Sequence, residues 1–280
     1  MKEQERLSLK ESIDINGVNL AEKFSFAKGF KTCISAYDDF GNVIFEKEEN
    51  QTVLGGALFA LAKMFDVNLN WSVSTLNNIL GIANTGDPLT EDDLKNTYVC
   101  LFGAGIGGSG DIPGTVRTVK FQQRELSQMI PFRITDQELP ESTKNKYWMR
   151  QKLDDGYTAY YLKTLDAKTC KALWLDGVDG EEGSAIPPNV FQSNRTEPIE
   201  CFAEMTLRID TKDFREYFNL NGDVNDAKIN TIGLFTGIKK QLADGTYDYK
   251  NVKLFSAFNF TDERFQLEKG MNITYKVYIV

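Results

Sequence analysis

The last third of the chain has the most regular alternation of apolar and polar positions. Residues 199–209 alternate up to Leu207 and Ile209, as expected for a strand with one buried face. Asp244-Gly245 is a turn signal between two later apolar runs. Three further strands are predicted after the first: 229–238, 249–260 and 271–280.

The earlier part of the chain contains a hairpin signal and several shorter strand candidates. Residues 31–37 and 43–45 are rich in β-formers and flank the turn cluster 38–42, which predicts an antiparallel hairpin. Residues 98–102 form a continuous apolar run, typical of a strand buried on both faces. The remaining candidates are 115–121, 158–165 and 172–175.

Between these strands the apolar period changes to that of a helix. Apolar residues at i, i+3, i+4 and i+7 predict a helix over residues 53–66, with Thr52 as its N-cap. A short apolar segment at 74–81 is either helical or a packed turn. Residues 88–94 predict one capped helical turn, with Thr90 as the cap.

A second helix signal follows the strand at 199–209. Thr211 to Asp213 is expected to cap a short helix that reaches Phe218, with the Asp213 carboxylate near the positive helix end.

Together these elements predict a mainly β (α+β) fold, a β-sandwich-like domain with a helical insertion near residues 52–95. Residues 1–28 are charged and sparsely apolar, which predicts an N-terminal arm. The rest, 29–280, is expected to be a single β-rich domain. It contains a long loop at 176–198 that is rich in Gly, Pro, Asp, Glu and Asn.

Composition narrows the functional classes. The chain has 280 residues, 41% of them hydrophobic and 26% charged, which is typical of a globular protein. No run approaches the ~20 apolar residues needed to cross a bilayer, so no membrane partner is expected. The first ten residues are charged and do not resemble a secretory signal. The net charge of −8 disfavours sequence-specific nucleic-acid binding.

The chain contains no histidine, and this excludes more chemistry than any other feature. Ser-His-Asp and Cys-His catalysis and His-containing zinc sites cannot form within it. Carboxylate chemistry, lysine-based chemistry and oxygen-liganded cations remain. The four cysteines, Cys33, Cys100, Cys170 and Cys201, lie far apart without metal-binding spacing, so four reduced core thiols are favoured over two disulfides. We predict no enzymatic activity, no metal and no cofactor.

Two motifs have both a functional and a structural interpretation. Residues 103–108 match G-x-G-x-x-G after a predicted strand, but β-branched residues follow where a dinucleotide site needs a helix. A glycine-rich segment that lets two backbones approach is therefore favoured. The acidic stretch 176–182 lacks the spacing of a calcium loop, so a solvated turn is favoured over a cation site. Arg117, Lys120 and Arg124 are the nearest approach to a basic patch.

Several segments resemble virion structural proteins of tailed bacteriophages. The resemblance rests on Ile229–Gly237, Lys253–Phe260 and Ile273–Ile279, in which a glycine-containing strand, an L-F-S strand and an aromatic strand follow one another. The segments around Leu54–Gly56 and Met129–Arg133 are similar too. The resemblance implies a β-rich subunit of a symmetric ring in the neck, collar, connector or tail, without catalytic residues.

This role implies a homo-oligomer within the virion that also contacts neighbouring proteins such as portal, connector or tail proteins. Synthesis and assembly would occur in the cytoplasm of the bacterial host, and an acidic ring would allow passive passage of DNA. We expect the subunits to meet through the arm, the glycine-rich loop and the last strand. The candidate interface residues are Leu7, Ile13, Ile15, Val18, Leu20, Gly105, Ile106, Ile112, Tyr275, Val277 and Ile279.

Two other functions remain open. A glycan-binding module of a tail tip or baseplate would use the aromatic group Tyr157, Tyr160, Tyr161 and Trp174 to stack on sugars. A hydrolase based on two carboxylates is the least favoured, because the 40 acidic residues nominate no pair.

Overall fold

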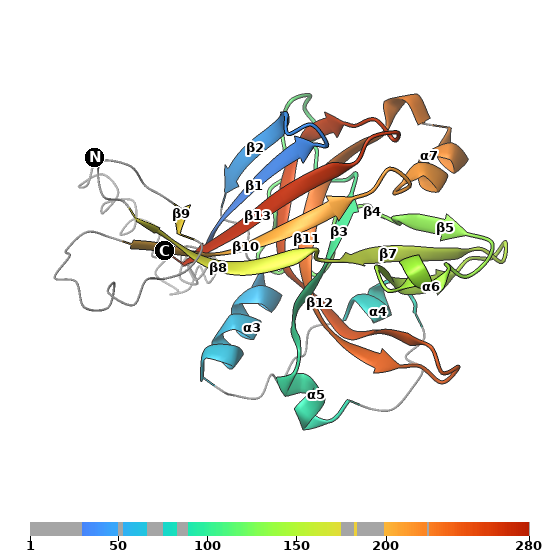
Figure 1. Cartoon of the computed structure of the whole chain (residues 1–280), viewed down its shortest axis with the longest axis horizontal. Helices are drawn as coiled ribbons and strands as arrows, with labels where there is room; N and C mark the ends of the chain where they lie inside the picture. Colours follow the sequence, from blue (N-terminus) through green and yellow to red (C-terminus); the bar gives the residue numbers. More distant parts are fainter. Residues whose placement is uncertain are drawn as a thin grey trace, which may run out of the picture.

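A computed structural model of the chain describes residues 30–49, 53–65, 75–82, 89–174, 182–183, 199–222 and 224–279. These residues form two antiparallel sheets with a few short helices around them (Figure 1). The prediction of a mainly β, sandwich-like fold with helices between residues 52 and 95 is confirmed. The predicted arm at 1–28 lies outside the described residues, as does most of the loop at 176–198.

The first sheet contains six strands, and the strand nearest the end of the sequence lies in its middle. β13 (Met271–Ile279) pairs with β1 (Phe30–Asp38) on one side and with β10 (Ile199–Ile209) on the other. β1 also pairs with β2 (Val43–Glu49), which confirms the predicted hairpin. On the other side of β10 the sheet continues through β8 (Ala167–Trp174) to β9 (Glu182–Gly183).

The second sheet is built around two long strands, β11 (Lys228–Gln241) and β12 (Tyr247–Arg264). The remaining order is β3 (Tyr98–Gly105), β7 (Thr158–Thr164) and β5 (Arg133–Thr135). Two further strands lie off this path: β4 (Met129–Ile130) pairs with β3, and β6 (Tyr147–Lys152) pairs with β7.

The two sheets pack face to face around an aromatic core. Phe45 of β2 stacks on Phe260 of β12, with ring centroids 4.6 Å apart. The hydroxyls of Tyr275 in β13 and Ser256 in β12 hydrogen-bond across the core at 2.8 Å. Such contacts between facing sheets define a β-sandwich.

The second sheet is also covered on its outer face. A second cluster of buried side chains, which includes Leu101, Phe235, Leu254 and Trp148, packs on that side. β11 is consequently buried without a break over residues 229–238. This explains why these strands appear as apolar runs instead of alternating patterns.

Helices close the outer edge of β12. α3 (Leu54–Phe65) confirms the helix predicted over 53–66, although its predicted cap Thr52 lies outside the described residues. Gly56 permits the approach, because a Cβ there would collide with the backbone carbonyl of Phe255. Phe59 packs edge-on against the Phe255 ring at 6.1 Å. The Val53 amide also donates to the Phe255 carbonyl, so the edge of β12 is closed to another strand at this position.

The other helices are short: α4 (Leu76–Ile79), α5 (Glu91–Lys95), α6 (Glu141–Lys144), α7 (Arg215–Asn221) and the 3₁₀ turn η3 (Val224–Asp226). Thr90 caps α5 as predicted, because its hydroxyl accepts from the Asp93 amide while the Asp93 carboxylate accepts from the Thr90 amide. In the described part of the chain, no helix is long and apolar enough to cross a membrane.

One predicted strand is wrong. Residues 115–121 form a loop in which only Val116 makes a single bridge, to Ser109. This loop turns back on the glycine-rich segment through the Arg117 amide, which donates to Gly108, and reaches α3 through the carbonyl of Phe121. Val116 is exposed, whereas Val119 and Phe121 are half-buried, so the period of two here reflects an extended loop that packs some of its apolar side chains.

Candidate functional site

Those predicted interface residues that the structure describes do not form one exposed surface. Leu7, Ile13, Ile15, Val18 and Leu20 lie outside the described residues. Of the others, Ile112 is exposed and Ile106 is half-buried. Gly105 is buried in β3, Tyr275 and Val277 are buried in the core, and Ile279 pairs with both Phe30 and Cys201.

The expectation that the last strand pairs with a neighbouring subunit is therefore wrong. β13 already has a partner strand on both sides, so its backbone groups are used within this chain. The Tyr275 side chain is fully buried, and its hydroxyl is held by Ser256. Strand addition needs an edge, and within the described residues the free edge of this part of the sheet belongs to β2.

The glycine-rich segment is a packing feature. A Cβ at Gly103 would lie 2.9 Å from the Leu162 side chain, and one at Gly105 would lie 2.7 Å from the Ser127 carbonyl oxygen. The segment leads into a loop and not into a helix N-terminus. The interpretation as close backbone approach is confirmed.

A polar cluster ties this segment to the second sheet. The Asn230 amide nitrogen donates to the Ile106 carbonyl at 2.9 Å and to the Asp262 carboxylate at 2.8 Å. Burial would raise the pKa of Asp262, but hydrogen bonds from Asn230, Lys228 and Ser109 outweigh it and lower the pKa to about 2. The charges of this cluster therefore hold a loop in place.

The aromatic group predicted to stack on sugars is dispersed. Tyr157 is exposed in a turn, Tyr161 is half-buried, and Tyr160 is fully buried in the core between the sheets. Trp174 lies on β8 in the other sheet. Because Tyr160 is enclosed, the four residues cannot act together as the predicted stacking group.

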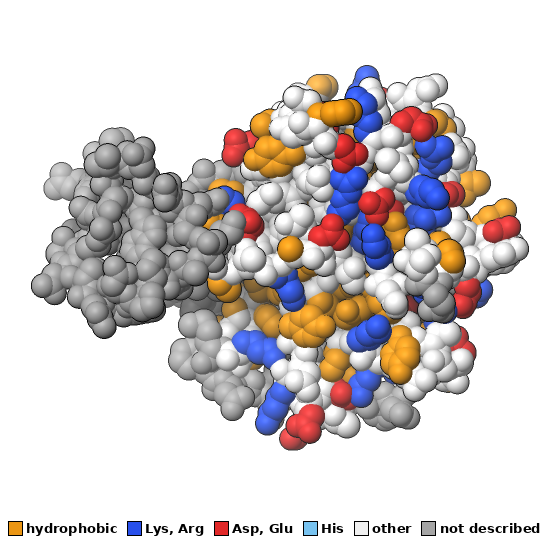
Figure 2. Space-filling view, in the orientation of Figure 1, with side chains coloured by type: hydrophobic (Ala, Val, Ile, Leu, Met, Phe, Trp, Pro, Cys, Tyr) orange, Lys and Arg blue, Asp and Glu red, His pale blue; other side chains and the backbone are white. Residues whose placement is uncertain are grey.

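The predicted basic residues and the cysteines are also not arranged as a functional cluster. Arg117 is exposed and pairs with Asp111 at 2.9 Å. On the face drawn in Figure 2, Lys and Arg side chains are interspersed with Asp and Glu side chains.

All four cysteines are free, but Cys170 and Cys201 are exposed, so the expectation of four core thiols is wrong for these two. Among the described residues, no group of His, Cys, Asp and Glu is placed to hold a metal ion.

The structure instead contains two clusters of charged side chains, one between the two sheets and one lining a pocket. The first, which we call the core cluster, consists of Lys163, Asp210, Asp213 and Tyr147. The Lys163 ammonium lies 2.6 Å from the Asp213 carboxylate and 2.8 Å from the Asp210 carboxylate. The Tyr147 hydroxyl and the Asp210 amide donate to Asp213, each at 2.7 Å.

The core cluster joins the two sheets. Lys163 comes from β7 of the second sheet, whereas Asp213 follows β10 of the first. Lys163 and Asp213 are each 1% exposed, and the ammonium lies 5.2 Å from the Tyr147 ring. Burial raises the pKa of Asp213, and the three surrounding donors oppose that shift. Because every oxygen of Asp213 has a donor, this cluster is closed.

The predicted role of Asp213 as a helix cap is wrong. α7 begins at Arg215 after Phe214, whose backbone has a left-handed φ of 64°, and no side chain caps the helix. That backbone turn directs Asp213 inward, where it meets Lys163. The pattern that predicted the cap is local, whereas the partner of Asp213 lies on a distant strand.

The second cluster lines a pocket of about 390 Å³, which we call the α4 pocket. Its wall is built from four distant segments: residues 77–82 around α4, Glu138, residues 150–158 of β6 and β7, and residues 242–250 at the β11–β12 hairpin. The Gln151 side chain donates to the Leu80 carbonyl at 2.9 Å and holds α4 against β6.

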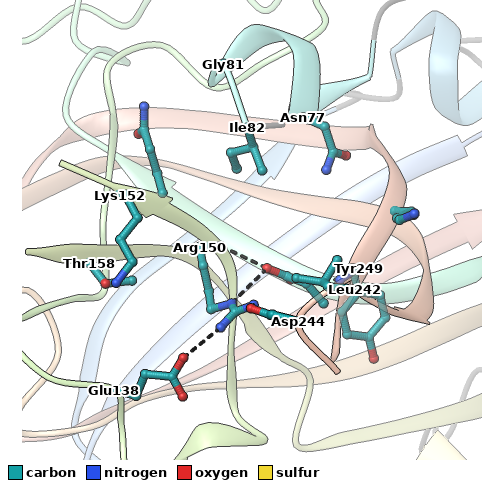
Figure 3. A pocket seen from close by; sticks show the side chains of 13 residues that line it. Asn77, Gly81, Ile82, Glu138, Arg150, Lys152, Thr158, Leu242, Asp244 and Tyr249 are labelled. Carbon is teal, nitrogen blue, oxygen red and sulfur yellow. Dashed lines mark hydrogen bonds and ion pairs between the residues drawn. The ribbon is translucent and has the colours of Figure 1, made fainter. Parts of the chain in front are cut away.

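Arg150 is the centre of the α4 pocket (Figure 3). Its guanidinium lies 3.1 Å from Glu138, 3.6 Å from Asp244 and 3.7 Å from Asp248. Asp248 is buried and accepts from the backbone amides of Met149, Arg150 and Tyr249 at 2.9, 3.0 and 2.7 Å. Burial raises the pKa of Asp248, and these amides together with Arg150 oppose the shift.

The α4 pocket differs from the core cluster in having an unmatched polar atom. Asn77 is 4% exposed and lines the pocket, yet its side-chain oxygen has no hydrogen-bond partner within the described residues. In Figure 3, Asn77 and Ile82 project from the α4 side towards the group formed by Arg150 and Asp244. A buried acceptor without a donor is costly, which makes this position notable.

Comparison with known proteins identifies no relative. The sequence matches no protein-family model and no curated protein, and the fold matches no solved structure.

Neither cluster was predicted from the sequence, although each has a local signal in it. Lys163 interrupts a β-prone run between Leu162 and Thr164, and Asp248 lies between Tyr247 and Tyr249 at the start of a strand. A single charge within a strand that is expected to be buried indicates a paired interior charge. The partners, however, are too distant in the sequence to be found by spacing.

Proposed function

We propose that this chain is a structural subunit of a tailed-phage particle that assembles with copies of itself into a ring in the neck, collar, connector or tail. The observation that carries the proposal is the position in the fold of the segments that resemble virion proteins. Ile229–Gly237, Lys253–Phe260 and Ile273–Ile279 lie in β11, β12 and β13. β11 and β13 are interior strands of their sheets and β12 flanks β11, so the resemblance falls on the framework and not on a pocket.

The use of charge within the fold supports the same role. The core cluster joins the two sheets, and the cluster around Asp262 fixes the glycine-rich segment. In both, ionisable side chains are matched by other groups of this chain. Such arrangements position and stabilise elements, which is what a subunit acting through shape requires.

The edges of the sheets indicate where copies would meet. α3 covers the outer edge of β12, and β13 is enclosed, whereas β2 pairs only with β1 among the described strands. β2 carries Glu46, Lys47 and Glu48, an alternating charge pattern that disfavours unspecific strand pairing. A ring contact at β2 would therefore need a partner surface of complementary charge.

The test is the oligomeric state of the purified chain with and without residues 1–28. We expect rings of defined size in negative-stain images and in light scattering for the full chain, and loss of the rings on removal of the arm. A protein that is monomeric in both forms, at high concentration and with purified neighbouring virion proteins, would contradict the proposal.

The glycan-binding alternative loses the aromatic group on which it was based, since Tyr160 is enclosed in the core. Tyr157 is exposed and Tyr161 is half-buried, and neither forms a stacking surface together with Tyr160.

A further inference from the structure

We propose that the α4 pocket binds a neutral, hydroxyl-rich ligand of the size of one or two sugar rings. The inference does not depend on the ring, because it rests on the pocket of this single chain. It also assigns no role to the aromatic residues that the sequence suggested for sugar binding.

The volume sets the size of the ligand. Sites for small molecules occupy about 300–1,000 Å³, and the α4 pocket, at about 390 Å³, lies near the lower limit. A site of this size accepts a monosaccharide or disaccharide and is too small for a folded partner.

The charge balance selects a neutral ligand. Three acidic residues line the pocket, Glu138, Asp244 and Asp248, and three basic residues oppose them, Arg150, Lys152 and Lys250. Arg150 is within 4 Å of all three carboxylates, so its charge is already compensated. An anion or a cation would therefore meet a site without an excess of the opposite sign, whereas hydroxyl groups can donate to the carboxylates and accept from the cations.

Asn77 supplies the position that a ligand would complete. Its buried side-chain oxygen needs a donor, and among the described residues none is present. Because this oxygen is sealed from solvent, the Asn77 side chain must rotate towards the pocket for a sugar hydroxyl to donate to it, and that hydroxyl can then accept in turn from a neighbouring group. Ile82 and Leu242 give the same pocket an apolar contribution, which suits the C–H face of a sugar ring.

The experiment is saturation-transfer difference NMR on the full chain, which works for a ring as well as for a monomer. The probes are glucose, galactose, N-acetylglucosamine and maltose. Glucuronate, glucose 6-phosphate and glutamate serve as charged comparators. We expect transfer to at least one neutral sugar, competition among the sugars that bind, and no transfer to the charged comparators. No transfer to any neutral sugar, or transfer to a charged comparator in preference, would overturn the proposal.

The matched variants are Asn77→Leu and Asn78→Leu. Both change neighbouring asparagines of α4, but Asn78 is exposed and does not line the pocket. We expect Asn77→Leu to weaken sugar binding at least tenfold while the unfolding midpoint stays unchanged or rises, because the variant removes a buried acceptor without a donor. Asn78→Leu should leave binding unchanged.

Two outcomes of this pair would count against the proposal. Unaltered sugar binding by Asn77→Leu would show that the side chain does not contact the ligand. A large loss of stability would show that the amide has a structural role. If that variant does not fold, Thr158→Val removes another hydrogen-bonding group of the lining and must then weaken binding instead.

Discussion

The core cluster and the α4 pocket use the same chemistry for different ends. Each places one cation among aspartate side chains and backbone amides, Lys163 in the first case and Arg150 in the second. In the core cluster both sheets enclose the charges, and Asp213 has donors on both oxygens. In the α4 pocket one side is open, and the Asn77 oxygen lacks a donor. The enclosed ion pair of the core cluster joins the two sheets, whereas the open side of the α4 pocket leaves polar atoms that a ligand can contact.

The substitution with the largest expected effect on stability is Lys163→Met. The substitution leaves Asp213 buried without its cation, and removing one partner of a buried pair costs about 3–5 kcal/mol. We expect a loss of this order in the free energy of unfolding, measured with urea. Lys120→Met is the control, because Lys120 is exposed in the loop at 115–121, and its effect should stay within about 0.5 kcal/mol. Equal stabilities of the two variants would show that the core cluster does not fasten the sheets.

A third buried cation, Lys253 of β12, tests the effect of enclosure on a charge. Burial lowers the pKa of Lys253 to about 8. The unfolded chain then binds one more proton between about pH 8 and pH 10.5, so stability should rise with pH in this window. Lys253→Met should flatten this rise, because the variant removes the group whose proton binding differs between the folded and unfolded chain. A series of urea titrations from pH 7 to 10.5 measures the slope, and an unchanged slope would contradict the assignment.

The smallest expected effect is that of Arg150→Met. Glu138 and Asp244 are exposed enough to be solvated, and Asp248 keeps its three backbone amide donors. We expect a loss of about 1 kcal/mol, well below that of Lys163→Met. Comparing urea midpoints of the two variants ranks the clusters directly. A loss for Arg150→Met as large as that for Lys163→Met would show that the open cluster is also structural.

The framework of the fold follows from local patterns, and the sites do not. The hairpin at 38–42, the helix at 54–65 and the strand at 199–209 each have a signal within a few residues, because turn chemistry and apolar period act locally. Residues 115–121 show the limit, since an extended loop has the same alternation as a strand. Register, and with it the central place of β13, is set by partners far along the chain.

The α4 pocket could not be predicted for the same reason. Asn77, Glu138, Arg150 and Asp248 meet only after α4, β6 and β12 have packed together. Asp213 illustrates the converse error. Its position before a helix favours capping, but the left-handed backbone at Phe214 and the buried ammonium of Lys163 draw it into the core.

The central position of β13 also has a kinetic consequence. Phe30 must find Ile279 before β1 and β2 can join β10 in one sheet, so closing this sheet requires an encounter between segments at opposite ends of the described fold. Contacts of such sequence separation slow folding and expose unpaired strand edges in the meantime. Until β13 pairs with them, β1 and β10 each have an unpaired edge. A chain delayed at that stage is the form most prone to aggregate.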